Sequence, residues 1–144
     1  MSRRVTIAIA AVLLAAVRVT ADWPQFLGPD RNGAYRGTPI VTTFPASGPK
    51  VVWSTKVGQG LAGPVVVGNR LILFHRVGVR EEVESRDVAR GATQWQYGYP
   101  TAYRNDFGFD EGPRAVPVVL DGIVYTFGAE GQLHAVSLDR GQRL

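Results

Sequence analysis

Residues 117–141 read Pro-Val-Val-Leu-Asp-Gly-Ile-Val-Tyr-Thr-Phe-Gly-Ala-Glu-Gly-Gln-Leu-His-Ala-Val-Ser-Leu-Asp-Arg-Gly, and this stretch decides the fold. Turn residues divide it into three short runs that are rich in β-branched and aromatic residues, at 118–120, 123–127 and 133–138. This pattern predicts a meander of antiparallel strands. Beyond residue 21, no segment keeps the 3.6-residue apolar period of a helix. The sequence therefore predicts an all-β chain.

The same order of runs and turns occurs earlier in the chain. One unit spans 64–95 and a second spans 117–144, so Pro117 follows Pro64 by 53 residues and Gly141 follows Gly91 by 50. An insertion confined to a hairpin tip, with 77–82 longer than 129–131, accounts for the difference. The internal repeat predicts two copies of one supersecondary unit.

The second run of each unit is apolar at nearly consecutive positions, at 71–74 and 123–127. Such strands need burial on both faces. A β-propeller provides it because each blade lies between two others. A flat sandwich favours cleaner alternation of apolar and polar residues, so the pattern favours a propeller of four-stranded antiparallel blades.

Three segments carry a resemblance to a known family. The turn and strand at 128–141 resemble the PQQ-binding-like β-propeller repeat, whose pattern includes Leu-x-Ala-Leu-Asp, a glycine turn and a closing Trp. The first unit matches it more loosely and closes at Trp95. Trp-Pro-Gln-Phe-Leu-Gly-Pro-Asp-Arg-Asn-Gly at 23–33 and Asn-Asp-Phe-Gly through Gly-Pro-Arg at 105–114 are similar to a bacterial subgroup of that family.

The resemblance implies a domain order and a range of functions. It assigns 22–50 to an ordered N-terminal loop and 51–144 to propeller repeats, with an aromatic insertion at 96–114. The family includes outer-membrane assembly subunits of the BamB type and quinoprotein dehydrogenases. At about 40 residues per blade, the 123 residues after position 21 supply at most about three blades, and the insertion after Trp95 reduces this to about two. A closed propeller has 4–8 blades, so we expect an open, incomplete N-terminal fragment.

The first 21 residues have the form of a signal peptide. Arg3 and Arg4 precede an apolar run at 5–17, and Val-Thr-Ala at 19–21 supplies small residues for cleavage. Cleavage after Ala16, an uncleaved anchor and a buried helix are the alternatives. The chain has no Cys, so it has no disulfide and no lipid-bearing Cys. We expect a periplasmic or extracellular protein without membrane insertion after cleavage.

The net charge of +4 is mostly a property of this leader. Three of the 16 Lys and Arg residues lie in it, which leaves 13 cations against 12 acids in the remainder. A nearly neutral chain has no electrostatic footprint for nucleic acid. We therefore expect no nucleic-acid partner.

The insertion at 96–114 holds the candidate binding residues. Its aromatic side chains either pack onto the propeller or form a recognition surface, where Tyr and Arg are common anchors. The candidates are Tyr99, Tyr103, Arg104 and Arg114. Arg114 either binds an anion or pairs with a nearby carboxylate. The insertion also holds four side chains with oxygen atoms of the kind that bind Ca²⁺: Asn105, Asp106, Asp110 and Glu111. They are weak candidates for metal ligands, because acidic glycine-rich loops are usually only solvated.

We assign no catalytic residue from the sequence. His75 and His134 occupy different positions in the two units and have no Ser-His-Asp spacing, so structural or exposed roles are expected, and Trp95 is expected to pack between blades. The expected function is an exported, non-catalytic propeller that binds a protein or polymer partner and needs no cofactor. The alternative is a quinoprotein alcohol dehydrogenase that uses PQQ and calcium, with its catalytic residues outside this chain. A polysaccharide-modifying component is a third reading.

Export predicts a defined N-terminus. The exported product is expected to begin at Asp22, because signal peptidase cleaves after small residues such as those at 19–21. N-terminal sequencing of the exported protein checks this. Recovery of intact Met1 from the cytosol would contradict it.

Overall fold

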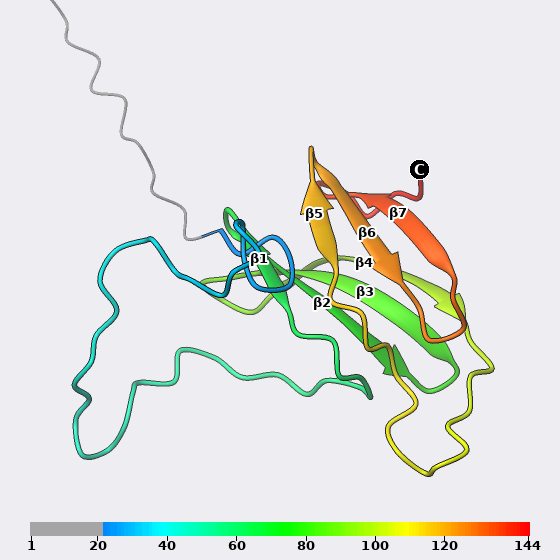
Figure 1. The fold of residues 1–144 in the computed structure, drawn as a ribbon, viewed down its shortest axis with the longest axis horizontal. Helices are drawn as coiled ribbons and strands as arrows, with labels where there is room; N and C mark the ends of the chain where they lie inside the picture. Colours follow the sequence, from blue (N-terminus) through cyan, green and yellow to red (C-terminus); the bar gives the residue numbers. More distant parts are fainter. Residues whose placement is uncertain (1–21) are drawn as a thin grey trace, which may run out of the picture.

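The computed structural model describes residues 22–144, and the predicted signal peptide at 1–21 lies outside the described residues. Residues 22–144 form antiparallel strands in two sheets of four and three strands, without a helix, as Figure 1 shows. The all-β prediction is therefore confirmed. The described part accordingly contains no helix long and apolar enough to cross a membrane.

Each sheet is a simple meander in chain order. The first sheet has the order β1-β2-β3-β4 and the second has the order β5-β6-β7. The strands are β1 (Val65–Val67), β2 (Arg70–Val77), β3 (Arg80–Asp87), β4 (Thr93–Pro100), β5 (Val118–Leu120), β6 (Ile123–Phe127) and β7 (Leu133–Ser137).

The hairpin between β2 and β3 differs from the expected one. Val77 pairs with Arg80, so only Gly78 and Val79 form the turn. Gly78 has φ +59°, which suits the first central position of a type II′ hairpin turn. The longer first unit therefore has longer strands rather than a longer hairpin tip.

Strand β4 extends into the segment that the sequence assigned to the aromatic insertion. Residues 96–100 continue the ladder with β3, in which Val83 pairs with Tyr97 and Glu81 with Tyr99. The alternation of Trp95, Tyr97 and Tyr99 puts all three on the same face. The irregular loop therefore begins only at Thr101.

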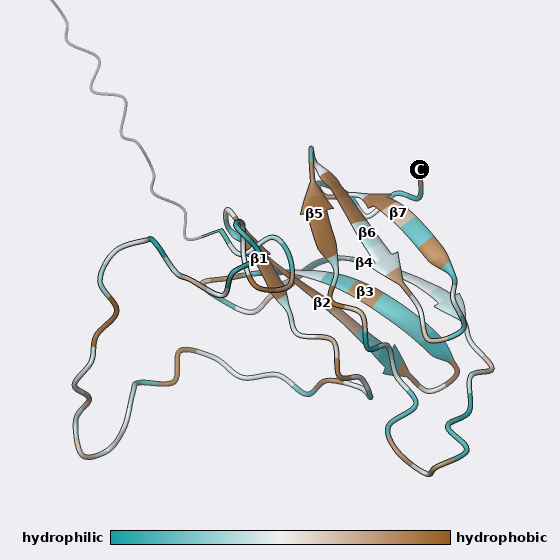
Figure 2. Ribbon diagram, viewed as in Figure 1, coloured by the Kyte–Doolittle hydropathy of each residue, from teal (hydrophilic) through white to brown (hydrophobic). Residues whose placement is uncertain are grey.

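The core lies between the two sheets. Nearly complete burial is shared by Val65, Ile72, Phe74 and Val83 of the first sheet and by Val119, Val124 and Val136 of the second. Figure 2 shows the brown strands β2 and β5 beside this interface. Burial of such side chains contributes about 1.5–3 kcal/mol each.

Two tryptophans make the same contact at two places. Trp95 Nε1 donates to the Leu138 carbonyl (2.9 Å), and its ring covers Gly141. Trp53 Nε1 donates to the Val88 carbonyl (2.8 Å), and its ring covers Gly91. The packing role expected of Trp95 thus has a second example in Trp53, which the sequence did not single out.

The N-terminal segment connects β1 and β5, the first strand of each sheet. Trp23 exchanges two backbone hydrogen bonds with Val66 of β1, and Val119 of β5 donates to the Pro24 carbonyl (2.8 Å). The chain then runs as a long arm, whose side chains are largely exposed; Trp53 contacts the first unit, and Gln59 then bridges Arg76 of β2 (Figure 1).

The ring contact predicts that Gly141 does not tolerate a side chain. Gly141→Ala places a Cβ 2.4 Å from Trp95 Cε3, and φ is +66°. Gly122 has a similar φ of +75° but open space around it. Gly122→Ala is therefore expected to cost about 1 kcal/mol from the backbone alone, and Gly141→Ala to cost about 2 kcal/mol more through overpacking.

Urea unfolding of the two variants measures this difference. Equal losses would show that the Trp95 ring does not constrain the turn.

Candidate functional site

The loop at 101–117 joins the two sheets and carries most of the predicted site residues. It contains Tyr103, Arg104, Asp106, Asp110, Glu111 and Arg114. Tyr99 lies outside it, in β4, where it is 6% exposed and its hydroxyl donates to Glu81 Oε2 (2.6 Å). Tyr99 therefore contributes to the packing of the sheets rather than to the loop surface.

Glu130, in the connection between β6 and β7, holds the start of the loop. Its Oε2 accepts hydrogen bonds from Thr101 Oγ1 (2.8 Å) and from the Ala102 backbone N–H (3.0 Å). One carboxylate oxygen thus fixes both the side chain and the backbone where β4 ends.

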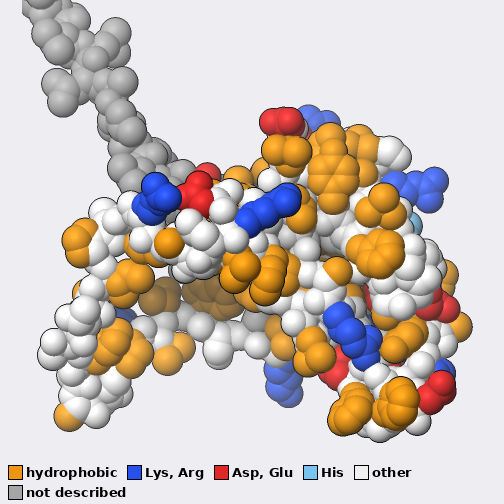
Figure 3. Space-filling view, viewed as in Figure 1, with side chains coloured by type: hydrophobic (Ala, Val, Ile, Leu, Met, Phe, Trp, Pro, Cys, Tyr) orange, Lys and Arg blue, Asp and Glu red, His pale blue; other side chains and the backbone are white. Residues whose placement is uncertain are grey.

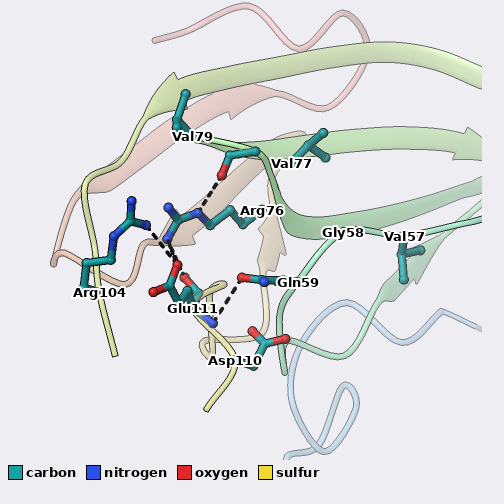
Figure 4. A pocket seen from close by; sticks show the side chains of 10 residues that line it. Val57, Gly58, Gln59, Arg76, Val77, Val79, Arg104, Asp110 and Glu111 are labelled. Atoms are coloured by element: carbon teal, nitrogen blue, oxygen red, sulfur yellow. Dashed lines mark hydrogen bonds and ion pairs between the residues drawn. The ribbon is translucent and has the colours of Figure 1, made fainter. Parts of the chain in front are cut away.

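Arg76, on β2, holds the middle of the loop. Its side chain is 3% exposed, and Nη1 donates to the carbonyls of Tyr103 (2.7 Å) and Glu111 (3.2 Å). Nε donates to the Gly78 carbonyl (2.9 Å), and Nη1 lies 3.3 Å from Glu111 Oε2. Figure 4 shows the guanidinium reaching from the strand into the loop. A buried charge satisfied in this way is a rigid anchor.

Residues 59–61 hold the later part of the loop, at 111–113. The Glu111 N–H donates to Gln59 Oε1 (3.3 Å), and the Pro113 carbonyl accepts from Leu61 (2.9 Å). A Cβ on Gly112 would lie 2.1 Å from the Gln59 carbonyl oxygen, so the two backbones touch. A hollow of about 700 Å³ lies beside this contact, between residues 57–59, the β2–β3 hairpin and the loop. Its lining includes Val57, Val79, Arg76, Arg104 and Glu111 (Figure 4).

The predicted metal ligands are engaged within the loop. Glu111 Oε2 pairs with Arg104 (3.0 Å) as well as with Arg76, and Asp110 Oδ1 accepts from the Gly112 N–H (2.8 Å). Asn105 Oδ1 accepts from the Phe107 N–H (2.9 Å). These contacts stabilise the loop, and the carboxylates of Asp106, Asp110 and Glu111 do not form a group with metal-ligand spacing.

Arg114 is exposed and folds back over its own loop. Its guanidinium lies 5.3 Å from the Tyr103 ring centroid and donates to the backbone carbonyls of Asp110 (3.0 Å) and Gly112 (3.4 Å). The expected pair with a carboxylate side chain is replaced by these contacts. Arg114 and Tyr103 line a second hollow of about 330 Å³ beside Phe127.

Metal-ligand spacing occurs elsewhere in the described residues, at His75, Glu82 and Glu84, whose ligand atoms lie within 4.8 Å of one another. His75 Nδ1 accepts from the Gly58 N–H (2.8 Å), which places the ring proton on Nε2. Nε2 lies 3.0 Å from Glu84 Oε1 and donates to it. Because both ring nitrogens are used, we interpret the group as a buried polar network rather than a metal centre.

His134 and two tyrosines form a polar contact between the sheets. Its ring stacks on Tyr99 with centroids 4.0 Å apart, and Nδ1 lies 2.9 Å from the Tyr97 hydroxyl. Desolvation, followed by the charge of Arg143, lowers the pKa of His134. Desolvation and the hydrogen bond to Glu81 raise the pKa of Tyr99. All three rings are therefore structural.

The tip of the loop is exposed, in contrast to the packed rings of Tyr97, Tyr99 and His134. Phe107 is 84% exposed and Phe109 is 72% exposed. The sequence left packing and recognition open for the aromatic segment, and the structure divides it: Tyr97 and Tyr99 pack between the sheets, whereas Phe107 and Phe109 face solvent.

Comparison with known proteins adds no relative. No protein-family model matches the sequence, and no curated protein matches it. Functional assignment therefore rests on the residues and their geometry.

The Arg76 anchor predicts a large difference between two equivalent substitutions. Arg76→Met removes a buried guanidinium that serves three carbonyls and the Glu111 carboxylate, and it is expected to cost about 3 kcal/mol. Arg104, whose side chain is 65% exposed, forms a single ion pair within residues 22–144, with Glu111. Arg104→Met is expected to cost no more than about 1 kcal/mol.

Urea unfolding gives both free energies, and hydrogen exchange over 101–117 tests whether only Arg76→Met frees the loop. Equal losses would contradict the anchor.

Proposed function

We propose that this chain is an exported, non-catalytic binding or scaffolding protein built from β-propeller blades of the PQQ-binding-like type. Its partner is a protein or polymer, contacted through the tip of the 101–117 loop. The exposure of Phe107 and Phe109 on a loop held by the buried Arg76 carries this proposal.

The blade assignment is supported by matched contacts in the two sheets. Val88 N–H bonds to Asn69 and Leu138 N–H to Gly122, at 3.0 and 2.8 Å. The turns that follow close with equivalent bonds of 2.8 Å, from Gly91 to Asp87 and from Gly141 to Ser137. A tryptophan ring covers each of these turns. Shared backbone and indole contacts favour two successive blades of one repeat.

The loop favours binding for a thermodynamic reason. Burial of an exposed Phe on a partner returns about 1.5–3 kcal/mol. A loop already ordered by Arg76, Glu130 and Gln59 loses little conformational entropy on binding. Arg104 beside the tip adds the Arg and aromatic combination that is common at binding hot spots.

The internal engagement of the ionisable groups favours binding over catalysis. Glu81 accepts from Tyr99 and from the Ala129 N–H, Glu84 contacts His75, and Glu111 contacts two arginines. These carboxylates serve the packing of the chain, so proton transfer to a substrate would have to break structural contacts.

The test replaces the two exposed rings. Phe107→Ser with Phe109→Ser is expected to leave the melting temperature unchanged, because both rings are solvated, and to reduce recovery of the partner on the order of ten-fold or more. Ile40→Ser, at a side chain that is 67% exposed on the arm, is the control. Quantitative cross-linking in envelope extract, with a photoreactive residue at the exposed position 106, measures recovery.

Equal recovery of the same partner by both variants would contradict the proposal. A saturable absorbance change on titration with PQQ and Ca²⁺ would favour the quinoprotein reading instead.

A further inference from the structure

We propose that the hollow of about 700 Å³ beside the 101–117 loop binds the carboxyl end of a peptide whose last side chain is aliphatic. Ligand pockets usually have volumes of about 300–1,000 Å³. The lining of this hollow does not include Phe107 or Phe109. These two residues belong to the exposed tip of the loop, where Figure 3 shows hydrophobic side chains at the surface. The inference therefore goes beyond the partner contact proposed for the tip.

Two arginines give the hollow a cationic wall. The guanidinium groups of Arg76 and Arg104 both contact Glu111 Oε2, at 3.3 and 3.0 Å, as Figure 4 shows. One carboxylate balances only one of the two positive charges. The wall therefore carries an excess positive charge, which favours an anionic ligand.

Arg76 also has an unused hydrogen-bond donor. Its side chain is 3% exposed, Nε donates to the Gly78 carbonyl, and Nη1 donates to the loop. Within residues 22–144, Nη2 forms no hydrogen bond with another residue. Because Arg76 lines the hollow, Nη2 is available to an acceptor that enters it. The planar fork of a guanidinium matches the two oxygens of a carboxylate, and the charge strengthens the hydrogen bonds between them.

Asp110 supplies a negative charge to another part of the lining. Its Oδ1 accepts from the Gly112 N–H (2.8 Å), whereas its Oδ2 has no hydrogen-bond partner among residues 22–144. In the same part of the chain, Asp110 forms no ion pair with Arg76 or Arg104. Its free oxygen can therefore accept a hydrogen bond from an N–H group of a ligand.

These charges favour a peptide end over a phosphate. A phosphate group carries a charge of about −1.5 to −2, so both Asp110 and Glu111 would repel it. A carboxylate balances the single excess charge of the two arginines. The last residue of a peptide combines this carboxylate with the N–H group that Asp110 can bind.

Three valines form the apolar part of the lining, namely Val57, Val77 and Val79. They are 58%, 46% and 66% exposed. An aliphatic side chain that packs against them removes apolar surface of both the ligand and the protein from water. No aromatic residue of the described chain lines the hollow, so it offers no ring for stacking. The apolar lining therefore favours an aliphatic last residue.

Backbone hydrogen bonds hold these walls in place. Gln59 exchanges two such bonds with Arg76 (2.9 and 2.7 Å), which fixes the segment that follows Val57. The Val79 carbonyl accepts from the Thr101 N–H (2.9 Å), which ties the β2–β3 hairpin to the start of the loop. A preformed site loses little conformational entropy on binding.

Titration of the purified full chain with the tripeptide Ala-Ala-Leu, followed by NMR, tests the site. The side-chain Nε–H signals of Arg76 and Arg104 are expected to shift in a saturable way. The same tripeptide with a C-terminal amide lacks the anionic end. Its affinity is expected to be lower by a factor on the order of ten or more, because the charge-assisted hydrogen bonds are lost. Inorganic phosphate is expected to bind more weakly than the tripeptide.

Two pairs of variants locate the ligand. Arg104→Gln is expected to lower the affinity for Ala-Ala-Leu on the order of ten-fold. Its control is Arg36→Gln, at a side chain that is 76% exposed and pairs with Asp30. Val79→Ser is expected to lower the affinity roughly three-fold, whereas Val52→Ser, at a residue of the arm that is 74% exposed, should not change it. Melting temperatures show whether each variant is folded, and all four positions are exposed.

Equal affinity for the acid and the amide, unchanged affinity in Arg104→Gln, or no shift at millimolar tripeptide would overturn the inference. Tighter binding of phosphate would overturn the assignment of a carboxylate. Equal binding of free leucine would overturn the peptide in favour of a free amino acid. A chain that binds none of these probes but still recovers its partner through Phe107 and Phe109 would overturn this site and leave the proposed function standing.

Discussion

Ile72, Phe74 and Val83 lose their contact with water only because the second sheet covers the face from which they project. This burial between sheets is the interaction on which the rest of the chain depends. With no Cys, the protein has no covalent constraint to replace it. Neither small sheet has a core of its own, because the apolar face of a sheet must be buried against another element. The connecting loop and the N-terminal segment hold their shapes because the sheets are packed.

Specific contacts then fix how the sheets meet. The Trp95 indole donates across the interface to Leu138 and lies flat against Gly141, a residue that leaves room for the ring. At the other end, the Glu81 carboxylate accepts from the Tyr99 hydroxyl and from the Ala129 N–H of the second sheet. Apolar burial provides most of the free energy, whereas these directional contacts select one arrangement, since a buried polar group without its partner is costly.

The same arrangement separates structural from exposed aromatic residues. The Tyr99 ring on β4 stacks against His134 and is buried, whereas the loop after Thr101 carries its phenylalanines away from the core. Arg76 is the link between these regions. Its guanidinium leaves the buried face of β2 and donates to two carbonyls of the loop, so loop order is coupled to the packing of the first sheet. Because Arg76 holds the loop from its buried side, the loop can expose Phe107 and Phe109 to solvent without folding over these rings.

The sequence by itself determined the all-β class and the three strand runs of the second sheet with the turns between them, because alternation and turn chemistry are local properties. It also determined that Trp95 would pack and that no histidine had catalytic spacing. Only the tertiary structure decided where β4 ends, since the pairing of Tyr97 and Tyr99 with β3 depends on a distant strand. It alone separated the buried Tyr99 from the exposed Phe107 and revealed Arg76 and Trp53, whose partners lie 27 and 35 residues away. The local sequence around an aromatic residue or an arginine is the same whether the side chain is buried or exposed. The sheet that packs against the side chain decides between the two.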